Sequence, residues 1–374
     1  MVGGSSTDGR RPGRPVPPRL RHMTSLSRAQ FLAAAGAVAA APWLGAAPAS
    51  ASGRRKPIHR GVCYAVSDFP GVRMRADVRA IARDLHADTI AIYGTGPERL
   101  AATTAEAAEQ GLRVWLQPRH GDVPPADIID HVAETGRAAE RLRRHGVRVV
   151  LSVGCEFVLF VPGIVPGADA VERVRNLLAG NFDPVLMKRR LTAFTARAAR
   201  AGRSVFHGPL TYGAAYDEDV DWSLFDLVSA NYYGDRPERD LASLTRLGKP
   251  VAVTEFGCCT YEGAEADGGL GWDVVDYTKE PPEIVGGLVR SERTQARHLV
   301  GQFDRFAAMG LHTATVYDFV TPDAPHTPDP RYDLDLASYS IVKTIWADDT
   351  DPAAGWHWEP KLAFHALSRR FAKP

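Results

Sequence analysis

The chain has 374 residues, of which 45% are hydrophobic and 24% are charged, as in an ordinary globular protein with a sizeable core. Its net charge of +1 conceals a division, because residues 1–51 hold six Arg and one Asp while the remainder carries a net charge of −4. A mildly acidic body without a basic stripe argues against a nucleic-acid partner.

The first 51 residues have the features of an export leader, and we expect them to form no part of the fold. Arg28 supplies a positive flank, residues 31–41 an apolar stretch, and residues 49–51 a small-residue cleavage site. Residues 27–32 resemble a twin-arginine signal in which Ala replaces the second Arg. The apolar stretch is shorter than the roughly 20 residues that span a bilayer. We therefore expect a secreted or cell-surface protein without a membrane span after processing; an uncleaved anchor is the alternative.

From residue 57 onward, short apolar runs alternate with longer stretches of helical spacing. The runs that we expect to form buried strands are 61–66, 89–93, 113–117, 147–153, 204–210, 227–232, 250–254 and 313–319. Glycines such as Gly111, Gly202 and Gly310 mark expected helix ends before the next strand. No Gly-rich phosphate loop follows the first run, which argues against a doubly wound nucleotide-binding sheet. We predict an α/β fold, a (β/α)₈ TIM barrel, as one domain over residues 57–374.

Two of these runs, the fourth and the seventh, end in a glutamate. These residues are Glu156 and Glu255. The active sites of such barrels lie at the C-terminal ends of the strands. A buried carboxylate costs several kcal/mol unless it is hydrogen-bonded or paired. One such glutamate has an ordinary explanation in a bond to backbone or arginine, but two that face each other across the barrel mouth favour a site with paired carboxylates.

The same residues carry a family resemblance. A glutamate that ends strand four and the sequence Glu255-Phe256-Gly257 at strand seven resemble the clan A glycoside hydrolases, which are retaining (β/α)₈ enzymes. Residues 358–367 are also similar to the last helix of many of those enzymes. The resemblance implies that Glu156 is the acid/base and Glu255 the nucleophile. It also implies that Tyr232 or Tyr233 donates a hydrogen bond to the nucleophile.

Two positions depart from the clan's pattern. Cys155 stands where the clan usually has an Asn that holds the sugar 2-hydroxyl, and Tyr317 or Phe319 stands where a Trp commonly ends strand eight. Both changes concern contacts to the reacting sugar, so they bear on activity rather than on fold. Residues 154–157, 254–261 and 332–339 also resemble an actinobacterial group described as abortive infection proteins, a phage-defence phenotype that these residues do not explain.

Other polar and aromatic side chains near the expected strand ends are candidates for binding substrate. They are Tyr64, Trp115, His120, His207, Asn231, Trp272 and Tyr317, with Arg119 beside them. Each has a structural alternative, since aromatic rings more often pack cores and a single histidine is more often a structural residue. Trp272 lies in a long Gly-rich stretch, residues 257–287, which we expect to form a lid or a substrate wall.

The remaining reactive side chains suggest neither a metal site nor a cofactor. The four cysteines, Cys63, Cys155, Cys258 and Cys259, permit disulfides in an exported chain, but we expect buried free thiols. An acidic loop contains Asp323, Asp329 and Asp333, whose oxygens could bind calcium, but we expect a solvated loop.

These features predict an exported retaining glycoside hydrolase that acts on carbohydrate through two glutamates. The alternative is a barrel of the same kind that binds carbohydrate or a protein partner without turnover. Facing carboxyls in an open cleft would favour catalysis. A salt-bridged or enclosed Glu156 would favour the inactive barrel.

Overall fold

The computed structural model describes residues 57–66, 71–215, 217–348 and 355–373. The predicted leader, residues 1–51, lies outside this part of the chain. Within it, none of the helices is long and apolar enough to span a lipid bilayer.

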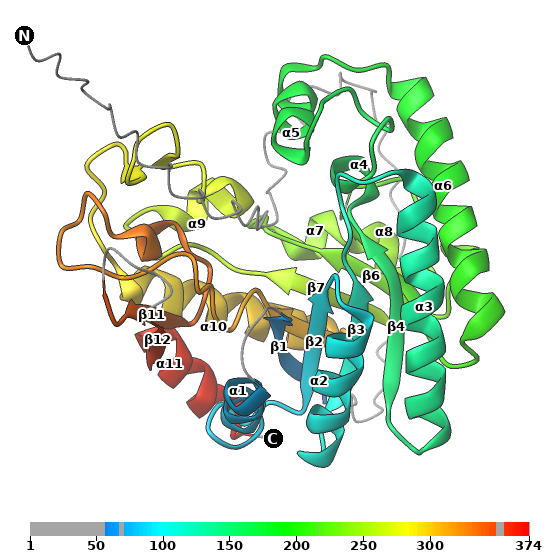
Figure 1. Ribbon diagram of the computed structural model, residues 1–374, viewed down its shortest axis with the longest axis horizontal. Coiled ribbons are helices and arrows are strands. Elements are labelled where there is room, and N and C mark those ends of the chain that lie inside the picture. Colours follow the sequence, from blue (N-terminus) through cyan, green and yellow to red (C-terminus); the bar gives the residue numbers. More distant parts are fainter. Residues whose placement is uncertain (1–56, 67–70, 216, 349–354, 374) are drawn as a thin grey trace, which may run out of the picture.

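Eight parallel strands form the wall of a closed barrel (Figure 1). They are β1 (His59–Ala65), β2 (Thr89–Gly94), β3 (Arg113–Pro118), β4 (Val149–Cys155), β5 (Leu210–Ala215), β6 (Val228–Asn231), β7 (Val251–Phe256) and β10 (Thr313–Val316). Strands β1 to β7 pair in chain order, and β10 closes the barrel by pairing with both β7 and β1. The predicted (β/α)₈ barrel is therefore confirmed.

Helices cover the outside of the barrel. The longer ones are α1 (Gly71–Arg83), α2 (Pro97–Glu109), α3 (Pro125–Arg144), α5 (Ala170–Ala179), α6 (Pro184–Val205), α10 (Glu292–Met309) and α11 (Leu362–Phe371). One-turn helices are α4 (Phe157–Phe160), α7 (Pro237–Asp240), α8 (Ala242–Thr245) and α9 (Ala264–Asp267), with 3₁₀ turns at Trp222–Leu224, Gly268–Leu270 and Leu334–Ala337.

The ends of the helices follow from local chemistry. The Asp183 side chain accepts hydrogen bonds from the Val185 and Leu186 amides and so caps the start of α6, where Pro184 lacks an amide donor. Gly310 ends α10 with φ of 72°, a left-handed conformation that glycine adopts without steric cost.

The range that the sequence predicts for the fifth strand is wrong. We expected it at residues 204–210, but α6 continues to Val205 and β5 begins at Leu210. Gly202 is not a helix end. It lies inside α6, where a Cβ atom would come within 2.9 Å of the Val153 side chain, so it allows the helix to approach the barrel closely. A short apolar run near a helix end cannot be distinguished from a strand by periodicity.

Two long segments leave the barrel wall after β7 and β10. The first contains α9 and a small hairpin of β8 (Val275–Asp276) and β9 (Glu283–Ile284). The second leads to an antiparallel pair, β11 (Val342–Trp346) and β12 (Trp356–Pro360). Both segments lie on the left in Figure 1, and the Ile284 amide donates a hydrogen bond to the Arg331 carbonyl between them. They form one cover beside the ends of β7 and β10.

Candidate active site

Glu255 lies near the end of β7 with both carboxylate oxygens engaged. The Tyr233 hydroxyl donates a 3.1 Å hydrogen bond to Oε2, and Arg119 forms an ion pair with Oε1. The residue is only 1% exposed. The family resemblance implies that Tyr232 or Tyr233 donates a hydrogen bond to Glu255, and Tyr233 is the one that does so. The Tyr232 hydroxyl instead donates to Asp240 on α7.

Glu156 follows β4 and has an unusual backbone. Its φ of 40° and ψ of 59° place a non-glycine residue in the left-handed region, a conformation that costs about 1–3 kcal/mol and is concentrated at functional sites. Its amide donates to the Gly213 carbonyl on β5, and its Oε1 accepts a 3.2 Å hydrogen bond from Asn231. The residue is fully buried, at 0% exposed.

Cys155 and Asn231 link the two glutamates. The Asn231 amide nitrogen donates to Glu156 and, at 3.3 Å, to the Cys155 sulfur, and that sulfur lies 3.7 Å from Oε1 of Glu255. The Thr254 hydroxyl donates to the other end of the Asn231 amide and so fixes its orientation. The sequence places Cys155 where the clan has an Asn beside the acid/base. The structure supplies an amide to Glu156 from β6, which is separated from β4 by β5.

Arg119 is enclosed beside Glu255. Its guanidinium donates to Gln117 Oε1 from two nitrogens, at 3.1 and 2.8 Å, and lies 4.2 Å from the centre of the Tyr93 ring, with Phe160 and Tyr317 rings at 5.9 Å. Burial alone would lower the pKa of Arg119, but the Glu255 carboxylate beside it raises this pKa well above its usual value. The group is therefore a permanent cation. The sequence predicts that Arg119 binds substrate hydroxyls, whereas in this structure its guanidinium pairs with Glu255.

Asp318 is a third acidic residue at this end of the barrel, and it contacts Tyr93, whose ring packs on Arg119. Asp318 follows Tyr317 at the end of β10, and the Tyr93 hydroxyl lies 3.2 Å both from its Oδ2 and from the Tyr317 hydroxyl. Burial raises the pKa of Asp318 to about 7, although hydrogen bonds from Tyr93 and Thr321 oppose the shift. Neither Tyr93 nor Asp318 is among the site residues that the sequence predicts. The sequence signal that points to them is their position where a strand ends.

The cover closes over this end of the barrel through Tyr339. Its hydroxyl donates to the Gly268 carbonyl at 2.6 Å, and the Gly271 amide donates back to it at 3.2 Å. Its ring lies 5.7 Å from that of Tyr233 and 6.2 Å from that of Tyr317. Tyr339 thus joins the segment after β7 to the residues around Glu255. Trp272 of this segment is partly buried and packs against the core rather than projecting into solvent.

Three predicted substrate-binding residues lie away from the two glutamates. The Tyr64 hydroxyl donates to Asp77 on α1, and Trp115 is a buried residue of β3 that lines a hollow at the opposite end of the barrel. His207 precedes β5 and lines that same hollow, so its placement at the barrel mouth is wrong. The error follows from the wrong range predicted for the fifth strand.

His120, a fourth predicted substrate-binding residue, makes an edge contact with the His131 ring of α3, with ring centres 5.3 Å apart.

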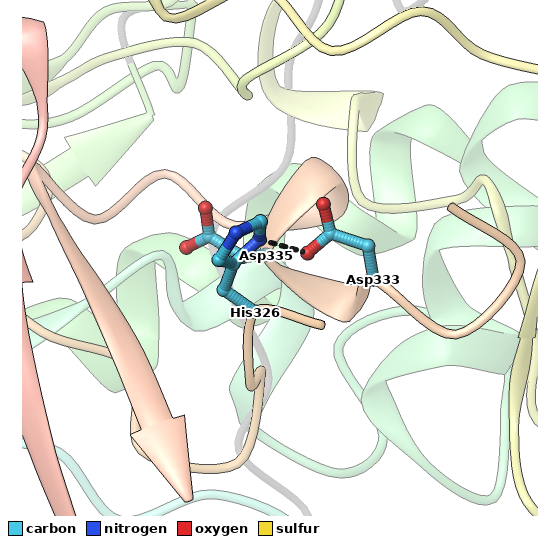
Figure 2. A group of neighbouring side chains, drawn as sticks. All are labelled: His326, Asp333 and Asp335. Carbon is cyan, nitrogen blue, oxygen red and sulfur yellow. Dashed lines mark hydrogen bonds and ion pairs between the residues drawn. The ribbon is translucent and has the colours of Figure 1, made fainter. Parts of the chain in front are cut away.

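Two acidic side chains of the loop after β10 are paired with cations from other segments of the chain. His326, Asp333 and Asp335 gather as Figure 2 shows, close enough to suggest a metal site. However, Arg290 pairs with Asp333 at 3.1 Å and with Asp335 at 2.8 Å, and Lys361 pairs with Asp335 at 2.8 Å. Both carboxylates of the cluster are thus engaged by cations, one of which, Arg290, also pairs with Glu292 at 3.0 Å, so the cluster does not need a metal. The expectation of a solvated loop is wrong for Asp333, which is 2% exposed.

All four cysteines are buried free thiols. Burial raises the pKa of Cys155 well above its usual value, and this effect exceeds the opposing influence of Arg119. The thiol next to Glu156 therefore stays protonated and is not a nucleophile at neutral pH.

Comparisons with known proteins show likeness in structure only. No family model and no curated protein sequence matches the chain. Among solved structures, the GH2 β-galacturonidase of Eisenbergiella tayi, bound to galacturonate, aligns with a TM-score of 0.50 at 16% identity over 86% of this chain and 52% of that chain. The β-glucuronidase of Parabacteroides merdae aligns with a TM-score of 0.53 at 14% identity over 85% of this chain and 39% of that one. The chain therefore spans about half or less of these proteins, and the barrel is the part that they share.

Proposed function

We propose that the chain is a retaining glycoside hydrolase in which Glu255 is the nucleophile and Glu156 the acid/base. The observation that carries this proposal is the pair of buried glutamates linked through Cys155 and Asn231. A barrel does not need such groups for stability, because well-packed apolar residues would serve as well or better. A strained backbone at Glu156 points the same way, since strain of this kind persists where function requires it.

The surroundings of the two glutamates suit different roles. Glu255 receives donors on both oxygens, from Arg119 and Tyr233, so its carboxylate is held in one orientation for attack. Glu156 accepts a hydrogen bond from the neutral amide of Asn231, and the apolar residues of α4 follow it directly. A carboxyl among apolar side chains is the type that keeps a proton for the leaving group.

The reaction then proceeds in two displacements. In the first, an oxygen of Glu255 bonds to the anomeric carbon as the glycosidic C–O bond breaks, and the proton of Glu156 passes to the leaving oxygen. In the second, water attacks the anomeric carbon, its proton passes to Glu156, and Glu255 departs as a carboxylate. Both glutamates return to their starting states, and no cofactor is consumed.

Entry of a sugar requires the cover to open. Glu156 is 0% exposed and Glu255 is 1% exposed, so both carboxylates are buried in this conformation. Tyr339 connects the segment after β7 to the rings around Glu255, so we expect opening to break its hydrogen bonds to Gly268 and Gly271. Closure after binding would exclude water from the site.

The same burial favours a second candidate function. A barrel in which Glu156 is enclosed and Arg119 neutralises Glu255 also fits a protein that binds carbohydrate, or a protein partner, without turnover. In that case the pair of Glu255 and Arg119 is structural, and any ligand is held outside the closed site.

Hydrolysis of a panel of nitrophenyl glycosides, including neutral sugars and uronic acids, separates the two candidates. We expect turnover of at least one member, with NMR showing that the first product keeps the configuration of the substrate. Glu255→Gln should abolish turnover, whereas Glu262→Gln, an exposed glutamate in the segment after β7, should not change it. Binding of glycans without any hydrolysis would favour the inactive barrel, and inverted product would exclude the double displacement.

A further inference from the structure

The opposite end of the barrel contains a hollow that the proposed reaction does not use. It has a volume of about 680 Å³ and lies among residues at or before the starts of β1, β3, β4, β5, β6 and β10. Binding sites for small molecules commonly have volumes of about 300–1,000 Å³. We call this hollow the basal cavity. Its walls include Arg113, Arg143, Arg148 and Arg203, against the single carboxylate of Asp226.

Two of the four arginines have an evident structural role. Arg143 is in the last turn of α3 and pairs with Glu140 at 2.8 Å, and Arg203 is in the last turn of α6 and pairs with Asp226 at 2.6 Å. Cations at helix C-termini also offset the negative end of the helix dipole. The positive charge of these two residues is therefore compensated within the protein.

Arg113 and Arg148 are different. Arg113 begins β3 and Arg148 precedes β4, so neither belongs to a helix. Neither has a carboxylate partner among the residues that the structure describes. Arg148 donates one hydrogen bond, at 2.8 Å, to the Gly111 carbonyl, and a guanidinium has five donors. These two residues give the cavity an excess of positive charge that nothing in the described chain neutralises.

The remaining walls suit an organic anion rather than a bare ion. His59 and His312 meet edge to face, with ring centres 5.1 Å apart, and Trp115 supplies an aromatic surface. The Nδ1 atoms of the two histidines already contact Asp88 and the Thr313 hydroxyl, so these rings contribute wall surface to the cavity. Guanidinium groups bind phosphate and carboxylate through paired hydrogen bonds, so two of them match two anionic groups on one ligand.

We propose that the basal cavity binds a small polyanion carrying two or more phosphate or carboxylate groups, held by Arg113 and Arg148. This site lies at the other end of the barrel from Glu156 and Glu255. It rests on none of the roles proposed for those residues.

Calorimetric titration of the full chain with inorganic pyrophosphate and, separately, with citrate tests the proposal. We expect saturable binding of one molecule of at least one probe. Arg113→Gln and Arg148→Gln should each weaken it by about tenfold or more, since each removes charge-assisted hydrogen bonds. Arg175→Gln, which removes an exposed arginine from α5, should leave it unchanged within about twofold.

The controls separate binding from folding and from general charge. Thermal unfolding without ligand checks that each variant is folded, and Arg113→Lys, which keeps the charge, should retain part of the affinity. Binding of pyrophosphate alone assigns phosphate groups, and binding of citrate alone assigns carboxylates. Failure of both probes to bind at millimolar concentration would overturn the proposal, as would an equal loss in Arg175→Gln.

Discussion

The two ends of the barrel differ in whether their charged side chains are buried and paired or exposed to solvent. Where the strands finish, Glu156, Glu255 and Asp318 are buried, the Arg119 side chain is 10% exposed, and neighbouring side chains hold all four. Where the strands begin, the basal cavity opens to solvent and contains more cations than carboxylates. Burying a charge costs several kcal/mol unless partners compensate it, whereas an exposed arginine costs little. Fixed geometry is therefore expected at the first end, and exchangeable ligands at the second.

The largest effect that sharpens this comparison is expected at Glu156. Replacement by Gln removes the proton donor while keeping the shape, so turnover of substrates with poor leaving groups should fall by about 10²- to 10⁴-fold. Substrates with activated leaving groups should lose much less in the first displacement. Rates across a series of leaving groups measure this difference, and added azide should restore part of the second step. An equal loss for all leaving groups would contradict the acid/base role.

Next in size is the ion pair between Arg119 and Glu255. Arg119→Met leaves a buried carboxylate without its cation, which should lower the free energy of unfolding by about 3–5 kcal/mol. Adding Glu255→Gln to that variant should cost less than the two single changes together, because the pair is lost only once. Urea denaturation of the four proteins gives the values. Strict additivity would show that the two groups do not interact.

A smaller effect, with a defined pH dependence, is expected at Asp318. Its pKa is about 7 in the folded protein, raised by burial, and near 3.8 in the unfolded chain. Between about pH 4 and pH 7 the folded state holds a proton that the unfolded state has lost, so the stability contributed by this group is full below pH 4 and is lost as pH rises through 7. Relative to the wild type, Asp318→Asn should therefore gain roughly 4 kcal/mol of stability between pH 4 and pH 8.

Denaturation at a series of pH values tests this prediction. Asp329→Asn, at an exposed position on the same loop, is the matched control and should run parallel to the wild type. Parallel curves for Asp318→Asn as well would show that this carboxyl does not titrate abnormally.

The smallest effect concerns the independence of the two ends. Joint replacement of Arg113 and Arg148 by Gln should leave kcat and KM for any glycoside substrate within about twofold of the wild type, since surface charges far from the reacting atoms contribute little. A steady-state comparison suffices. A large change in turnover would mean that the two ends are coupled, and would contradict the separation drawn between them.

The sequence predicts the barrel and its two glutamates because both depend on local patterns. Apolar runs alternate with helical spacing along the chain, and Glu156 and Glu255 each stand out at the end of such a run. His207 was misplaced because the end of α6 looks like a strand when only its apolar residues are considered. For the same reason the sequence predicts a helix end at Gly202, which instead lies inside α6 and allows this helix to pack closely against the barrel.

The contacts within the site could not be predicted in this way. Asn231 reaches Glu156 because β6 and β4 flank β5 in the closed barrel, and this depends on register across three strands. Arg119 turns toward Glu255 rather than toward solvent because Gln117 and Tyr93 hold it there. Such arrangements depend on side chains that are distant in the sequence, and no spacing along one strand encodes them.

The most direct test of the central claim is covalent labelling of the nucleophile. Activated fluoro-sugars trap the glycosyl-enzyme intermediate of a retaining enzyme, and peptide mass spectrometry then locates the sugar. We predict one adduct per chain on Glu255, with none in Glu255→Gln. An adduct on another residue, or turnover of glycosides without any trapped intermediate on Glu255, would contradict the role proposed for this glutamate.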